Sequence, residues 1–423
     1  IRISGIAEAG SHSPESSGTA PGVMASLPTR RFGRTELQIP LLSLGGMRFQ
    51  QSWTDLPAKQ ITPDAQALLE ATLQRAVDEG FHHVETARHY GSSERQLGWA
   101  LPRSPDPQRL LQTKVPPRPD VAAFEQELEL SFQRLNCDRL DLLALHGINL
   151  PEHLEQILRP GGCMEVVRRY QAEGRIGHVG FSTHGPTELI AEACETGAFD
   201  YVNLHWYYIR QNNGPALDAA RRHDMGVFII SPTDKGGHLH SPSARLLELC
   251  DPLHPIVFND LFCLNDSRVH TISVGAARPE DLDLHLEALH RLPDAAALIT
   301  PVDERLRAAA EAALGHDWMA TWCDGLPTWE ATPGGINLPV LLWLHNLLEA
   351  WDLESYAKAR YQLLGSGGHW FAGANADALD DGVSVDALKA VLGASPWQNR
   401  IPDILLSLKQ RLAGEAKMRL SSV

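Results

Sequence analysis

The chain has 423 residues, 43% of them hydrophobic, which is enough to bury a large core and is typical of a globular protein. A formal net charge of -15 argues against nucleic acid or an anionic membrane surface as partner, because both need clustered Lys and Arg. No apolar run approaches the ~18 residues that span a bilayer, so no membrane partner is expected. Six cysteines are scattered without paired spacing, which favours reduced thiols in a cytoplasmic protein over a disulfide framework.

The first segment, residues 1–27, is rich in Ser, Gly, Ala and Pro and begins with Ile1. It lacks the basic start and apolar centre of a secretion signal. We therefore expect a flexible leader or tag here, with Met24 as a candidate native start.

Residues 28–294 alternate short β-like runs with amphipathic helical stretches. Eight strand-plus-helix units in roughly 250 residues predict an α/β protein with a closed (β/α)8 TIM barrel. No GxGxxG turn is present, which argues against a doubly wound dinucleotide-binding sheet. The predicted strands cover residues 41–46, 82–87, 110–115, 140–146, 177–183, 201–207, 226–232 and 270–276.

Residues 295–423 show helical patterns alone. The patterns cover residues 301–315, 337–365, 385–393 and 401–414, with two loops rich in Gly and Pro between them. We expect a small helical C-terminal appendage that covers part of the barrel.

Polar residues end several of the predicted strands. Glu85, Lys114 and His146 each close an apolar run, and Tyr90 follows Glu85 on the same loop. In a (β/α)8 barrel the active site lies at these strand ends. The four groups therefore form a candidate proton-transfer set.

This set suits the reduction of a carbonyl group, because the alkoxide that hydride addition produces must receive a proton. A free tyrosine phenol titrates near ~10, and a neighbouring ammonium lowers that pKa. We predict that Lys114 acts in this way on Tyr90. Glu85 would hold Lys114 charged, and neutral His146 would donate a hydrogen bond to the substrate oxygen.

Several segments make the chain resemble the aldo-keto reductases over roughly residues 28–291. The spacing of Ala87, Tyr90, Gly91, Ser93 and Glu94 is the most diagnostic part. The resemblance implies that Tyr90 is the general acid of an NADPH-dependent reductase acting on an aldehyde or ketone. The segments that carry it are RFGRTELQIPLLSLGGMRF, ETARHYGSSERQLGWAL, TKV, LDLLALHG, GRIGHVGFSTHG, GVFIISP and SVGAARPEDL.

The same resemblance implies where NADPH binds. Ser182 and Asn203 would hold the carboxamide, with Asn203 in place of the family's usual glutamine. Arg278 would bind the 2′-phosphate, a role that suits a guanidinium. Ser231, Lys235 and Gly236 would lie along the pyrophosphate. The Gly275–Arg278 stretch, which opens a helix at Pro279, would face the adenosine phosphate, since amides at a helix N-terminus attract anions.

The chain departs from the family pattern at four positions. Glu85 stands where most members have aspartate, and Ile230 stands where many have an aromatic residue. Asp281 and His285 replace polar residues that would grip the adenine. The departures at Ile230 and after Gly275 motivate an alternative: an NADP(H)-binding sensor or regulatory protein with little or no turnover.

The segment from Cys323 to Pro333 resembles a C-terminal ferredoxin-like segment that some aldo-keto reductases carry. There CxxCxxCxxCP binds an iron–sulfur cluster, which needs about four cysteine ligands. The matching positions here are Cys323, Leu326, Trp329 and Thr332. We therefore expect a degenerate segment without metal.

Two further patterns are read as structural. His238 and His240 form an HxH pair without a third spaced ligand, so a solvated loop is preferred over a metal site. Tail aromatics are expected to form the tail core, with a lid over the substrate mouth as the alternative. They are Trp322, Trp329, Trp343, Trp351, Trp370 and Phe371.

Overall fold

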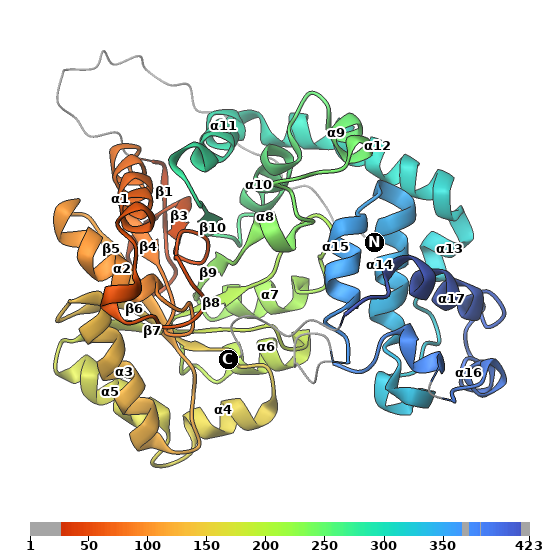
Figure 1. Cartoon of the computed structure of the whole chain (residues 1–423), viewed down its shortest axis with the longest axis horizontal. Helices are drawn as coiled ribbons and strands as arrows, with labels where there is room; N and C mark the ends of the chain where they lie inside the picture. Colours follow the sequence, from red (N-terminus) through yellow and green to blue (C-terminus); the bar gives the residue numbers. More distant parts are fainter. Residues whose placement is uncertain (1–26, 366–371, 381, 416–423) are drawn as a thin grey trace.

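A closed barrel of eight parallel strands lies at the centre of the barrel unit (Figure 1), in the order β10-β3-β4-β5-β6-β7-β8-β9. The structure, a computed structural model, describes residues 27–365, 372–380 and 382–415. All eight predicted strands are present, which confirms the (β/α)8 TIM barrel. They are β3 (Leu42–Gly45), β4 (His83–Glu85), β5 (Leu110–Val115), β6 (Leu140–His146), β7 (Ile176–Ser182), β8 (Tyr201–Leu204), β9 (Gly226–Ile229) and β10 (Thr271–Gly275).

An antiparallel hairpin that the sequence patterns did not predict closes the end at which the barrel strands begin. It consists of β1 (Thr29–Arg31) and β2 (Gln38–Pro40). Phe32 follows β1 and is fully buried against Tyr201 and Phe228. Its ring lies so close to Gly226 that a Cβ there would come within 2.6 Å, so only glycine fits. Of the predicted leader, residues 1–27, only Leu27 lies within the described residues.

Helices surround the barrel and bury one face each against it. In α1, for example, Thr62 caps the first turn by accepting a hydrogen bond from Ala65 N (3.3 Å), and Leu69, Leu73 and Ala76 face the core. The helices of this part are α1 (Pro63–Asp78), α2 (Ser93–Ala100), α3 (Val121–Leu135), α4 (Pro151–Leu158), α5 (Cys163–Ala172), α6 (Thr187–Glu195), α7 (Gly214–Arg222), α8 (Pro232–Lys235), α9 (Ala244–Cys250), α10 (Pro255–Asn265) and α11 (Asp283–Arg291).

The tail adds further helices, which confirms the predicted helical appendage. The long pattern at 337–365 is not one helix. Asp352 adopts a left-handed conformation (φ 57°) that ends α14, and a separate helix, α15, begins at Glu354. The tail helices are α12 (Ala295–Leu314), α13 (His316–Thr321), α14 (Leu338–Trp351), α15 (Glu354–Tyr361), α16 (Val385–Val391) and α17 (Ile401–Leu412).

Short 3-10 helices punctuate the connections. They are η1 (Ala58–Gln60), η2 (Leu101–Arg103), η3 (Pro279–Leu282), η4 (Leu292–Asp294), η5 (Trp329–Ala331), η6 (Pro333–Gly335) and η7 (Ala376–Asp380). No helix within the described ranges is both long enough and apolar enough to cross a bilayer.

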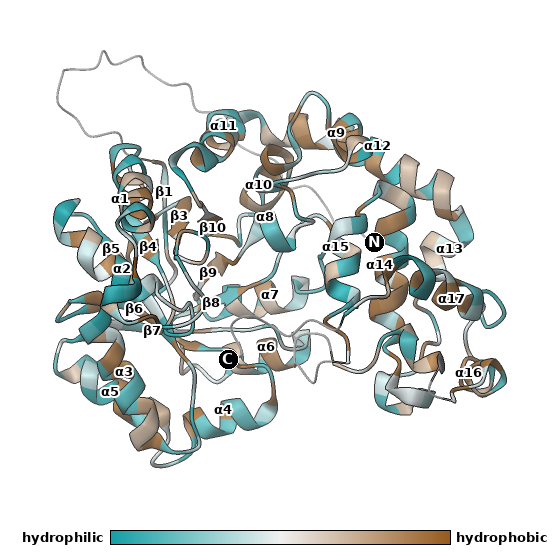
Figure 2. Ribbon diagram, viewed as in Figure 1, coloured by the Kyte–Doolittle hydropathy of each residue, from teal (hydrophilic) through white to brown (hydrophobic). Residues whose placement is uncertain are grey.

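The tail packs its core against the barrel helices. Figure 2 shows hydrophobic residues on β9, on β10 and on α14, which is apolar around most of its circumference. One apolar cluster joins Val257 and Leu261 of α10 to Leu306 of α12 and Leu341 of α14. The predicted domain boundary between residues 294 and 295 coincides with the start of α12, yet it stays a prediction because the two parts share this core.

Candidate active site

The barrel brings the four predicted catalytic residues together at the ends of neighbouring strands. Glu85 ends β4, Lys114 lies near the end of β5, and His146 ends β6. The Tyr90 hydroxyl lies 3.4 Å from Nζ of Lys114, and its ring stands perpendicular to that of His146 at 5.9 Å. All four side chains line one cavity.

Lys114 is held in a buried ion pair. Its Nζ donates to Oε2 of Glu85 and to the Thr86 carbonyl oxygen (2.8 Å), while the second Glu85 oxygen accepts from Ser273 Oγ (2.9 Å). Burial by itself would lower the pKa of Lys114, but the Glu85 carboxylate and the Tyr90 oxygen offset this and raise it above its ordinary value. The lysine is therefore a charged group beside a phenol. Glutamate in place of the family's aspartate does not break this contact.

A buried network fixes the loop that carries Tyr90. Ser93 Oγ donates to the Gly46 carbonyl oxygen (2.8 Å), and Arg88 pairs with Glu94. Burial raises the pKa of Glu94, and the Arg88 charge and the Thr113 hydroxyl (2.6 Å) oppose that rise. Gly91 is required here, because its φ is +55° and a Cβ would meet the Ser52 carbonyl oxygen at 2.0 Å. The motif around Tyr90 thus positions the phenol.

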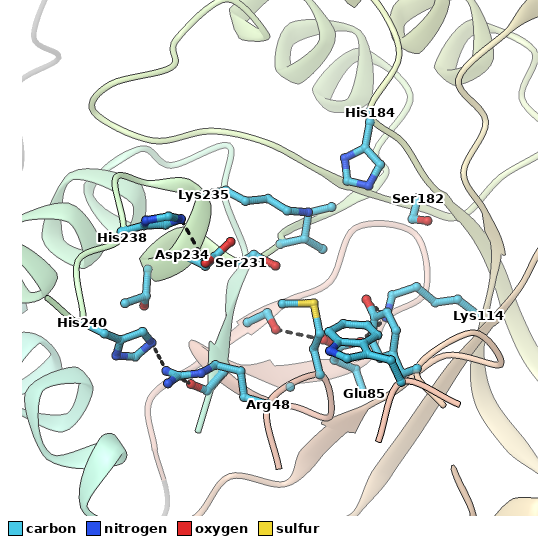
Figure 3. Close-up of a pocket in the computed structure, with 18 of the residues that line it drawn as sticks. Arg48, Glu85, Lys114, Ser182, His184, Ser231, Asp234, Lys235, His238 and His240 are labelled. Atoms are coloured by element: carbon cyan, nitrogen blue, oxygen red, sulfur yellow. Dashed lines mark hydrogen bonds and ion pairs between the residues drawn. The ribbon is translucent and has the colours of Figure 1, made fainter. Parts of the chain in front are cut away.

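The active-site cavity has a volume of about 810 Å³, which is in the range of small-molecule sites. Figure 3 shows Lys114 and Glu85 on one side of it and Arg48 and His240 on another. Four predicted cofactor-binding residues line it: Ser182, Ser231, Lys235 and Gly275.

Three other predicted cofactor-binding residues do not line the cavity. Asn203 is fully buried, and neither polar atom of its amide has a partner within the described part of the chain. Gly236 caps the C-terminal end of α8, where a Cβ would meet the Pro232 carbonyl oxygen at 1.9 Å. The Arg278 side chain is 68% exposed and pairs with Asp281 at 3.3 Å.

Asp281 occupies the helix N-terminus at which the phosphate was expected. Its Oδ2 accepts from Ala277 N (2.9 Å) at the start of η3. Although burial alone would raise the pKa of Asp281, this hydrogen bond, Arg278 and Arg48 lower it, so the group is a carboxylate. A phosphate bound at this helix N-terminus would therefore have an anion as its neighbour.

Two histidines differ from their predicted surroundings. His285 does not face the cavity but is fully buried on α11, where it pairs with Asp260 at 2.5 Å. The HxH pair is not a solvated loop: His238 and His240 are half-buried and both line the cavity. Burial lowers the pKa of His240 to about 4, and the adjacent Arg48 acts in the same direction.

Several cavity residues were missed by sequence reasoning. Arg48, in the loop after β3, donates to the Gly275 carbonyl oxygen (3.2 Å) and contacts His240. His184 lies two residues beyond Ser182 and pairs with buried His205. Their place in the sequence was the only feature that could have predicted them, since both Arg48 and His184 follow the ends of predicted strands.

The tail also reaches the cavity, through α15. Ala359, Arg360 and Leu363 line it, and Arg360 pairs with Asp234 at 3.3 Å. The described tail aromatics do not line it; Trp351 and its neighbours pack in or against the tail core, and Trp370 and Phe371 lie outside the described residues.

Known proteins resemble this chain in sequence and in fold. Residues 41–254, slightly more than half of the chain, match the family model described as the aldo/keto reductase family, and the chain belongs to that family. It is similar to aldo-keto reductase AKR11C1 from Bacillus halodurans in its holo form, with a TM-score of 0.55, 18% identity, and coverage of 66% of this chain and 96% of that one.

A second similar structure is a thermostable aldo-keto reductase in complex with the inhibitor epalrestat. The TM-score is 0.52, with 20% identity and coverage of 64% of this chain and 99% of that one. At these identities the structures show the shared fold alone. No curated protein matches the chain significantly in sequence.

Proposed function

We propose that the chain is an NADPH-dependent reductase that converts an aldehyde or ketone to an alcohol, with Tyr90 as general acid. The observation that carries the proposal is the 3.4 Å contact between the Tyr90 hydroxyl and the buried Lys114 ammonium, at the mouth of the barrel. The family supports an oxidoreductase scaffold. The substrate would be a small carbonyl compound, since the cavity has a volume of about 810 Å³ and is lined by barrel loops and by residues of α15.

In this mechanism the chain's own residues handle the proton and the developing charge. The Tyr90 hydroxyl gives its proton to the substrate oxygen as negative charge develops there. Lys114, held charged by Glu85, stabilises the phenolate that remains. His146, whose ring is 5.9 Å from that of Tyr90, would orient the carbonyl by a hydrogen bond.

The cavity fits a nicotinamide dinucleotide in part. A bound cofactor would supply the hydride, and Ser182, Ser231, Lys235 and Gly275, which line the cavity, would hold it. Arg48 adds a second cation at the Gly275 end. The choice of NADPH over NADH rests on the resemblance and on Arg278, which would have to turn inward.

The test is NADPH oxidation against a broad panel of aldehydes and ketones, run beside a fluorescence titration of NADPH. We expect saturable cofactor binding and turnover of at least one carbonyl compound. Failure of the protein to bind either nicotinamide cofactor would contradict the proposal.

The sensor alternative has one structural observation in its favour, the Asp281 carboxylate at the expected phosphate position. Tight NADPH binding without oxidation by any member of the panel would favour it. The cytoplasmic location also stays a prediction, because it rests on the cysteine pattern.

We propose that the tail segment from Cys323 to Pro333 holds no iron–sulfur cluster. Cys323 is exposed, and the Thr332 hydroxyl at the last ligand position donates to the Thr328 carbonyl oxygen (2.9 Å). Iron analysis of purified protein tests this, and a stoichiometric iron content would contradict it.

A further inference from the structure

A second cavity lies where the barrel meets the tail. Its volume is about 710 Å³, and its walls come from the segment between β8 and α7 and from α7, α12, α13 and α14. We call it the seam cavity. The residues that matter here are Trp206, Tyr208, Arg210, Trp322, Trp343 and Trp351.

The segment after β8 separates the seam cavity from the active-site cavity, because its side chains alternate in direction. His205 Nδ1 lies 2.6 Å from the Tyr207 hydroxyl, which donates to the carbonyl oxygen of Ile230, a residue of the active-site wall. Trp206 and Tyr208 instead line the seam cavity. Among the described residues the two cavities have no lining residue in common. The seam cavity is therefore a separate site.

Indole rings form much of the seam cavity. The Trp343 N–H donates to the Ile209 carbonyl oxygen (3.1 Å), and the Trp351 N–H donates to that of Leu306 (2.9 Å). Trp206 differs: the residue is only 8% exposed, yet its Nε1 has no partner in the described ranges. A buried indole N–H normally finds an acceptor. This one is positioned to donate to a ligand.

Two arginines of the seam cavity differ in their charge partners. Arg268 donates to Asp266 (2.6 Å) and Asp218 (3.0 Å), which balance its charge. Arg210 donates to Asn212 Oδ1 at 3.3 Å, and no carboxylate within residues 27–365, 372–380 and 382–415 forms an ion pair with it. Burial lowers the pKa of Arg210, but a guanidinium stays protonated in a protein. An unbalanced charge at the wall of an apolar cavity favours an anion.

We propose that the seam cavity binds a planar aromatic anion, with the ring between the indole side chains and the anionic group against Arg210. Aromatic walls favour a flat ring, and a planar guanidinium favours a carboxylate. The Trp206 N–H supplies a further donor. This site is distinct from the reductase site and does not depend on the proposed reduction.

The probe is 2-naphthoate, measured by isothermal titration on the full chain. We expect Arg210→Gln to weaken its binding by roughly tenfold or more, the range for a lost charge-assisted hydrogen bond. The matched control is Arg222→Gln on α7, whose side chain is 58% exposed and pairs with Glu195, and which should leave binding unchanged. The neutral 2-naphthamide should bind the wild type and Arg210→Gln alike.

A second variant covers the chance that Arg210→Gln disturbs the fold, which thermal unfolding will reveal. Val340→Trp adds bulk inside the seam cavity and should abolish naphthoate binding. Tyr90→Phe, which changes the other cavity, should leave it intact. No naphthoate binding by the wild type, or binding that survives both Arg210→Gln and Val340→Trp, would overturn the proposal.

Discussion

The two ends of the active-site cavity are built in different ways. At one end Glu85, Lys114 and His146 come from adjacent strands, and the ion pair between Glu85 and Lys114 is buried. At the other end Arg48 comes from a loop and Arg360 from the tail, and both are joined to partners far away in the sequence. The register of the barrel strands fixes the relative positions of the residues at the first end. The positions of the residues at the second end depend on how the loops and the tail pack against the barrel.

The two ends differ in how far the barrel fold by itself determines the positions of their residues. Parallel pairing places Lys114 beside Ala144, two residues before His146, so the relative positions of these strand ends follow from the fold. No such rule fixes Arg48 over Gly275. We therefore expect the residues at the strand end of the cavity to carry out the chemistry, and those at the loop end to determine which ligands bind.

The largest effect is expected from Lys114→Met at the strand end. Removing the cation leaves Glu85 as a buried unpaired carboxylate, so the free energy of unfolding should fall by roughly 3–5 kcal/mol. Carbonyl reduction should fall by about 10²-fold or more, because Tyr90 loses the cation that makes it an effective general acid. Urea denaturation and steady-state kinetics measure the two effects.

The double variant Lys114→Met with Glu85→Leu is the control for this result. It removes both charges, so stability should recover while reduction stays low. Equal destabilisation by the single and double variants would show that the ion pair is not the cause.

A smaller effect concerns pH and the buried His83 beneath the strand end. Burial lowers the pKa of His83 from 6.5 to about 3, and the Lys114 charge acts in the same direction. Between pH 6.5 and about pH 3, His83 is protonated in the unfolded chain but neutral in the folded protein. Stability from this group is therefore full above pH 6.5 and lost as the pH falls toward 3, by about 2 kcal/mol at pH 5.

Urea denaturation at pH 7 and pH 5 measures this loss. His83→Gln should remove that part of the pH dependence, whereas His316→Gln, on a side chain that is 79% exposed, should retain it. Identical slopes for the wild type and His83→Gln would contradict the assignment.

The smallest effect is expected at the loop end, from Asp281→Asn. The amide keeps an acceptor for Ala277 N but removes the charge at the helix N-terminus. NADPH should bind about two- to fivefold more tightly, and NADH binding should not change. Fluorescence titration of both cofactors tests this, and an equal gain for both would place the 2′-phosphate elsewhere.

The sequence predicted those features of the structure that depend on residues close together in the chain. Strand and helix periodicity predicted all eight barrel strands, and strand ends predicted the group of Glu85, Lys114, Tyr90 and His146 that the barrel brings together. The helix break at Asp352 was missed because the apolar pattern continues through it.

Long-range packing explains the other misses. Nothing local to His285 shows that it faces Asp260 rather than a cofactor, and nothing local to Arg360 shows that α15 reaches the cavity. Phe32, which follows β1 of the hairpin, packs against Tyr201 and Phe228 of the barrel. Each of these positions is decided by a partner that is distant in sequence.

We propose that the Tyr90 phenol, beside the Lys114 ammonium, delivers the proton in carbonyl reduction. Tyr90→Phe tests it most directly, because the ring and its contacts remain and only the hydroxyl is lost. We predict a loss of turnover of roughly 10²–10⁴-fold with NADPH affinity unchanged. Turnover equal to that of the wild type would contradict the role of Tyr90 as general acid.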